Sequence, residues 1–236
     1  MPYRRLPNTD QARIRALKAV IERADMQRTY DMAVSFNSLM HARNFLAKFE
    51  SAQIYYAECY ARQSKAASKH LANAKVARLY ISHFIQVLNL SAIRGEIKPS
   101  YKELYGLDAK SNNVPDLASE SAMVEWGRKI IEGENKRTSQ GGIPIYNPTI
   151  AKVKVHYDIF KESYERQKNF QMLTARSLEK LAAMREEADA LILDIWNQVE
   201  KKFEEVTPNE KRLDCCRAYG LVYYYRTGEK KKEENV

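Results

Sequence analysis

Glycine and proline are missing from two long stretches of this sequence. Neither residue occurs from Asn8 to Arg94 or from Thr149 to Thr207. The sequence has 8 glycines and 7 prolines, and 10 of these residues lie between Gly95 and Pro148. These two residues interrupt regular structure most strongly, so each stretch is free of strong breakers. Regular polar and apolar alternation is also absent there, and Ala, Lys, Glu, Leu and Met dominate, which argues against β structure and predicts two helical blocks.

Long apolar runs and a leader segment are missing as well. No uninterrupted apolar run approaches the roughly 20 residues that cross a bilayer. The opening residues, MPYRRLPNTD, carry charge but have no apolar h-region behind them. The sequence therefore predicts a protein without membrane association and with a cytoplasmic location.

Recognisable catalytic and cofactor motifs are also missing. There is no Walker loop, dinucleotide fingerprint, H-E-x-x-H or G-x-S-x-G motif. The 3 cysteines are an odd number without paired zinc-ligand spacing, which fits a reducing compartment. The Glu-x-x-His signature of di-iron bundles is excluded by the residues that stand three before the histidines, Ser38, Ala67, Tyr80 and Val153. We predict a non-enzymatic protein with no metal, no cofactor and no evident small-molecule substrate.

Acidic residues are absent between Glu58 and Glu96. Residues 1–100 hold 16 Lys and Arg against 7 Asp and Glu, and residues 101–236 hold 23 against 23, so the first part carries the whole net charge of +9. A field of this sign attracts polyanions or an acidic protein surface. The candidate contact residues for an acidic partner or nucleic acid are Arg62, Lys65, Lys69, Lys75 and Arg78.

Apolar residues in the first block recur with helical spacing. A helix is expected to begin at Thr9 or Asp10, whose side chains can accept hydrogen bonds from first-turn amides. The pattern changes phase between residues 25 and 31, where Thr29 is a candidate cap for the next helix. Residues 64–68 offer another turn. We therefore expect a break in this block.

The second block carries a similar pattern. Asn147 followed by Pro148 predicts a helix start, because Asn caps well and Pro suits the first helical position. Apolar residues then recur in a 3-4 rhythm, which favours one very long helix, with residues 174–177 as an alternative turn. Residues 207–210, TPNE, form a capping-box pattern that predicts a last helix to about Tyr225.

The region between the blocks is predicted to be irregular. Ser100 with Glu103 is expected to cap a short turn, Asp116 to start one short helix that contains Trp126, and residues 140–146 to form a loop.

These patterns together predict an all-α protein, an elongated helical bundle with long antiparallel helices and an irregular Gly/Pro-containing central region. The expected parts are a basic N-terminal block (1–94), the irregular region with one short helix (95–147), and a long helix plus a terminal helix (148–236) that packs with 1–94 as a single domain. Trp126 and Trp196 are expected core anchors.

Small residues line one narrow face of the acid-free segment. At about 100° per residue, five of them share a stripe that we expect to be buried against another backbone, with Arg62, Lys65 and Lys69 left in solvent. They are Ala57, Ala61, Ser64, Ser68 and Ala72.

The function predicted from these features is that of a structural or protein-interaction protein. Long apolar seams that one chain does not cover favour a protein partner or self-association. The alternative is a nucleic-acid-binding protein that uses the basic half, with Tyr55, Tyr56, Tyr60 and Tyr80 stacking on unpaired bases, although no nucleic-acid-binding motif is recognisable.

Overall fold

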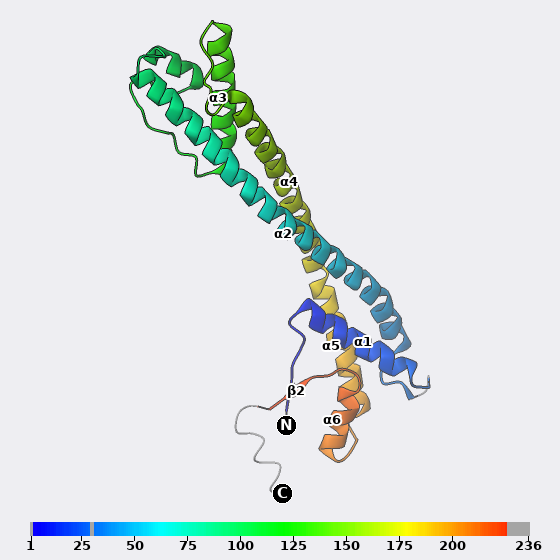
Figure 1. The fold of residues 1–236 in the computed structure, drawn as a ribbon. Helices are drawn as coiled ribbons and strands as arrows, with labels where there is room; N and C mark the ends of the chain where they lie inside the picture. The colour runs from blue at the N-terminus through cyan, green and yellow to red at the C-terminus, as the bar shows by residue number, and fades with distance from the viewer. Residues whose placement is uncertain (1, 29–30, 226–236) are drawn as a thin grey trace. The chain divides into compact units, whose positions relative to one another are not determined.

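The computed structural model describes residues 2–28 and 31–225. Six α-helices dominate these residues: α1 (Asp10–Asp25), α2 (Phe36–Ile93), α3 (Glu120–Ser139), α4 (Ile150–Ala183), α5 (Arg185–Lys202) and α6 (Asn209–Arg217) (Figure 1). A 3₁₀ helix, η2 (Pro99–Tyr105), and two short strands, β1 (Tyr3–Arg4) and β2 (Tyr223–Tyr224), are the other named elements. The prediction of an all-α fold is confirmed.

The helices of the first block begin at hydroxyl caps. Thr9 accepts a hydrogen bond from the Ala12 amide, so α1 starts where predicted. Thr29 lies outside the described residues, and α2 begins at Phe36, where the Ser35 hydroxyl accepts from the Ser38 amide at 3.2 Å. The break between α1 and α2 is confirmed. The alternative turn at residues 64–68 is wrong, because strong helix formers carry α2 through this segment without interruption.

The second block contains two helices instead of one very long helix. The first, α4, begins at Ile150, and Thr149 provides the cap that was expected from Asn147, because its hydroxyl accepts from the Lys152 amide at 3.3 Å. The helical path is interrupted at Met184, and α5 follows immediately. Residues 174–177, the predicted alternative turn, are helical.

The terminal helix is shorter than predicted. It ends at Arg217 and has no side-chain cap at its start, so the capping-box interpretation is wrong. Gly220 follows with a φ of 84°, a conformation that favours glycine, and turns the chain out of the helix. The β-prone residues beyond it then form β2, in which Tyr224 pairs with Tyr3 of β1.

The central region contains η2 and one α-helix, α3. This helix begins three residues later than predicted for an Asp116 cap, since Ser119 supplies the capping hydroxyl and accepts from the Ala122 amide at 3.1 Å. It extends over 20 residues. Residues 140–146 form the predicted loop.

The chain divides into two compact units, one formed by residues 1–59 with 174–236 and the other by residues 60–173. The division falls inside α2 and α4, so both sequence blocks contribute to both units. The boundaries predicted at residues 94 and 147 separate the helical blocks from the irregular region, and they do not coincide with the limits of the two units. The packing of blocks 1–94 and 148–236 as a single domain stays a prediction.

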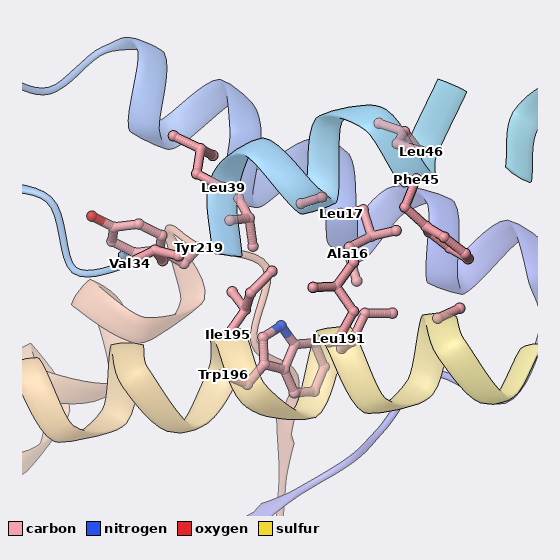
Figure 2. Packing of buried hydrophobic residues seen from close by; sticks show 14 of the residues in the cluster. Ala16, Leu17, Val34, Leu39, Phe45, Leu46, Leu191, Ile195, Trp196 and Tyr219 are labelled. Carbon is pink, nitrogen blue, oxygen red and sulfur yellow. The ribbon is translucent and has the colours of Figure 1, made fainter. Parts of the chain in front are cut away.

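The first unit has one core, built from α1, residues 36–59 of α2, α5 and the segment around α6. Trp196 is 1% exposed and shares this core with Leu17, Leu39 and Ile195, as predicted for a core anchor (Figure 2). The Arg13 guanidinium on α1 donates to both carboxylate oxygens of Asp189 on α5, at 2.7 and 2.8 Å.

The second unit packs residues 60–93 of α2, η2, α3 and residues 150–173 of α4 around a separate core. The two long helices are antiparallel here: His70 contacts Ser163, and Tyr80, ten residues further along α2, stacks on His156 with ring centroids 4.2 Å apart. Trp126, the other expected anchor, is only half-buried and carries the Lys129 ammonium over its ring.

The stripe of small residues on α2 is on the opposite side from the one predicted. Ala57, Ala61, Ser64, Ser68 and Ala72 are all exposed, and the buried face of the second unit instead follows the line His70, Ala74, Ala77, Ile81 and Phe84. Alanine occurs on both faces of this segment, so small side chains alone do not determine which face packs. The bulky residues beyond position 80 determine the phase.

We expect Gly133→Ala to destabilise the second unit. An added Cβ would lie 2.6 Å from ring atoms of Tyr105 and 2.8 Å from the carbonyl oxygen of Leu104, which belongs to the backbone and cannot rotate away. Overpacking costs about 1–3 kcal/mol and the gain in helix propensity offsets up to about 1 kcal/mol, so a net loss of roughly 1–2 kcal/mol is expected in urea unfolding. The exposed Asn135→Ala on the same helix should be neutral or slightly stabilising, and equal effects of the two variants would contradict the packing argument.

Candidate functional site

All five predicted contact residues are exposed on α2 in the second unit. The structure brings together Arg62, Lys65 and Lys69, which line a groove between α2 and α4. Lys75 and Arg78 lie outside this groove, and Arg78 donates to the carbonyl oxygen of Ala118 at 3.0 Å. The five predicted contact residues therefore form two groups on the exposed face of α2, and only the first group lies at the groove.

The groove between α2 and α4 is lined by both cationic and apolar side chains. It encloses about 470 Å³. Its apolar lining includes Ala66, Ile159 and Phe170. On the α4 side, Arg166 adds a cation that is paired with Glu162 in the preceding turn. Charge and apolar contact are thus available to one ligand at the same place.

An exposed seam of small and apolar residues runs along α2 beside this groove. We use the name α2 seam for Ala61, Ser64, Ser68, Ala72 and Leu79, which fall within a sector of about 80° when each residue turns the helix by about 100°. On the same projection, Lys65 and Lys69 flank one side of the seam and Arg78 flanks the other, while Lys75 lies within the sector. Cations therefore border the α2 seam on both sides.

Apolar exposure on α2 continues towards its carboxyl end. The exposed fractions are 72% for Leu71, 65% for Leu79, 51% for Leu90 and 62% for Ile93. Among the described helices, α2 alone contains a window long and apolar enough for a membrane span, with mean hydropathy 1.2 and 39% of the window buried. Core helices of soluble proteins also pass this test of length and composition.

His70 lies at the base of the groove and joins three helices. Its Nδ1 is 3.0 Å from the Ser163 hydroxyl, and its Nε2 is 2.6 Å from a carboxylate oxygen of Glu120. Hydroxyl, imidazole and carboxylate occur in this order in serine hydrolases. However, Ser163 lies in the middle of α4, where backbone amides are used within the helix and cannot form an oxyanion hole. We therefore interpret His70 as a structural residue whose hydrogen bonds join α2, α4 and the first turn of α3.

A buried ionic network at the other end of the second unit has no counterpart among the predicted sites. Glu134 is fully buried and accepts from Arg137 Nη2 at 2.9 Å and from the Ile145 amide at 3.0 Å. Arg137 Nε donates to the Tyr105 oxygen at 2.7 Å, and the Tyr105 hydroxyl donates to Glu134. Arg137 Nη2 also donates to the Ile143 carbonyl, at 2.9 Å.

Arg137 keeps its charge despite burial. Burial alone lowers the pKa of Arg137, but hydrogen bonding to Tyr105 and Glu134 outweighs this effect and holds the pKa above its usual value. Burial and the hydrogen bond to Glu134 raise the pKa of the Tyr105 hydroxyl, which therefore remains a donor. A sequence signal for the network does exist, because Glu134 and Arg137 continue the 3-4 spacing of the buried residues Met123 and Ile130.

Comparison with known proteins finds no matching family model, no similar curated protein and no similar solved structure.

Proposed function

We propose that this protein is a non-enzymatic interaction protein whose α2 seam docks an acidic amphipathic helix of a partner protein. The observation that carries the proposal is an exposed small and apolar seam with cations along both edges. It lies within a segment that has no acidic residue between Glu58 and Glu96.

The small side chains of the α2 seam suit close packing against a second helix. Ala61, Ser68 and Ala72 allow a second backbone to come close, and Leu79 provides an apolar contact at the end of the seam. A partner helix with apolar residues facing the seam would place its flanking positions against Lys65 on one side and Arg78 on the other. Glutamate at these positions would be complementary in charge, as in the flanking pairs of coiled coils.

The apolar lining of the groove favours a protein ligand over nucleic acid. Phosphate backbones gain little from apolar surface, whereas Ala66, Ile159 and Phe170 add apolar lining next to the cations. Tyr60, at 57% exposure, is the feature that favours the nucleic-acid alternative, because exposed aromatic rings can stack on bases. Self-association is the third arrangement, with a second copy supplying the acidic helix.

The charge test uses a synthetic probe because the natural partner is unidentified. A labelled 21-residue peptide with Leu at the a and d positions and Glu at e and g should bind the full chain, and the same peptide with Lys at e and g should not. The variant Lys65→Glu/Lys69→Glu should weaken binding by about tenfold, since each reversal replaces a surface attraction of about 0.3–0.4 kcal/mol by a repulsion of similar size. The control Lys201→Glu/Lys202→Glu changes the net charge equally, on α5, and should bind like the original chain.

Other outcomes separate the alternatives. Tighter binding of single-stranded RNA than of the acidic peptide, with loss in the same α2 variant and steep salt dependence, would establish the nucleic-acid alternative instead. A concentration-dependent dimer in sedimentation that the α2 variant abolishes would assign the seam to a second copy. Equal peptide affinity in both charge variants would contradict any role of the α2 cations.

A further inference from the structure

We propose that the second unit binds a small organic anion in a cavity beside the loop of residues 140–147, with Nη1 of Arg137 donating to the anionic group of the ligand. This loop cavity lies apart from the α2 seam and the groove, and the proposal is independent of the docking function. It encloses about 630 Å³ between the end of α2, residues 94–98 and the loop.

The first argument is an incompletely used arginine. Arg137 is only 3% exposed and lines the loop cavity. A guanidinium carries five N–H donors, and here Nε and Nη2 bond to Tyr105, Glu134 and Ile143. Within residues 2–28 and 31–225, Nη1 has no hydrogen-bond acceptor. Nη1 is not among the buried atoms that lack a partner, so it is accessible at the cavity and can donate to a group from outside the chain.

The second argument is that the loop leaves Nη1 uncovered and is held in place. A Cβ at Gly142 would lie 2.8 Å from Arg137 Nη1, so the glycine keeps this space open. The Ile143 carbonyl and the Ile145 amide are fixed by the buried network on either side of Pro144. The donor and the loop are therefore arranged before any ligand arrives, which lowers the entropic cost of binding.

Charge in the loop cavity favours an anion. Arg94 is paired with Glu96, at 2.7 and 2.9 Å, and these two charges compensate each other. The charge of Arg137 is balanced by Glu134, which lies behind it. Lys98 is exposed, lines the cavity and adds a positive charge. The sum over these groups is one positive charge, which suits a ligand with a carboxylate or phosphate monoester group.

The remaining lining indicates an apolar body for the ligand. Ile97 and Ile145 are buried beside the cavity, whereas Ile143 is 75% exposed and Tyr146 is 76% exposed on the loop. Apolar side chains with a few convergent polar groups are the usual composition of small-ligand sites. An aryl or alkyl group on the anion would cover these exposed loop side chains.

The test titrates the isotope-labelled full chain with phenyl phosphate, benzoate, inorganic phosphate and the neutral benzyl alcohol, observed by NMR. The expected result is saturable shifts of the Gly141 and Gly142 amides and of the Arg137 guanidinium with the two aromatic anions, and weaker binding of inorganic phosphate. Whichever aromatic anion binds more tightly identifies the preferred anionic group. Lys98→Glu should weaken binding by about tenfold and leave the buried network untouched, whereas Lys110→Glu, an exposed lysine outside the loop cavity, should have no effect.

Four results would overturn the proposal. The first three are the absence of saturable shifts with any anion, affinity for benzyl alcohol equal to that for phenyl phosphate, and equal loss in Lys98→Glu and Lys110→Glu. An unshifted Arg137 guanidinium signal in the presence of bound anion would likewise contradict the assignment of Nη1 as the donor.

Discussion

Glu134→Ala is expected to lower the free energy of unfolding of the second unit by about 3–5 kcal/mol, because it removes one partner of a buried ion pair and leaves the other charge uncompensated. The Arg137 guanidinium would keep only the Tyr105 oxygen and the Ile143 carbonyl as acceptors. The Ile145 amide would lose its acceptor as well. Urea unfolding followed by circular dichroism measures the loss.

Two further variants test whether the loss of stability comes from the buried ion pair or from substitution on this helix in general. Glu132→Ala removes an exposed carboxylate of the same helix that pairs with Arg128, and should cost less than about 1 kcal/mol. The double variant Glu134→Leu/Arg137→Met removes both charges and should recover part of the loss, since apolar replacement of a complete buried pair is often tolerated. Recovery should be incomplete because Ile145 still lacks an acceptor. Similar losses for Glu132→Ala and Glu134→Ala would show that burial of the network does not determine its effect.

The sequence pattern predicts the helical structure of α2 but not the face along which this helix packs. Helix was correctly predicted there, because the residues from 36 to 93 combine high helix propensity with the absence of Gly and Pro. The packing phase was wrong, because alanines occupy both the buried position 74 and the exposed position 72. Extending the buried line backwards from Ile81 and Phe84 would have selected the correct face. The same correction leaves the α2 seam exposed, and this exposure makes the seam a candidate contact surface.

The candidate sites differ in how far sequence reasoning reached them. The cations of the groove were found from charge alone, since the missing acidic residues leave Lys65 and Lys69 unmatched along their own segment. The loop cavity was not found. Its donor, Arg137, interacts with Tyr105, which lies 32 residues away in the sequence. No local pattern records such a contact, and only the tertiary fold brings these groups together.

Trp196→Ala is the second large effect expected, in the core of the first unit. Trp196 is 1% exposed, and its replacement by alanine should leave a large cavity among Leu17, Leu39 and Ile195 (Figure 2). Truncation of a buried tryptophan typically costs about 3–5 kcal/mol, through lost transfer energy and lost packing. Thermal unfolding should show a clear fall in the midpoint of this unit, and the second unit, which has a separate core, provides an internal reference.

Trp196→Phe is the matched variant that identifies the cause. The indole Nε1 of Trp196 is buried and has no hydrogen-bond partner within the described residues, so phenylalanine removes an unsatisfied donor and keeps most of the aromatic surface. We expect this change to cost less than about 1.5 kcal/mol, well below the loss for Trp196→Ala. If Trp196→Phe were as damaging as Trp196→Ala, the indole N–H would have to make an essential contact. In that case the core of the first unit would depend on a polar interaction at Trp196 in addition to apolar packing.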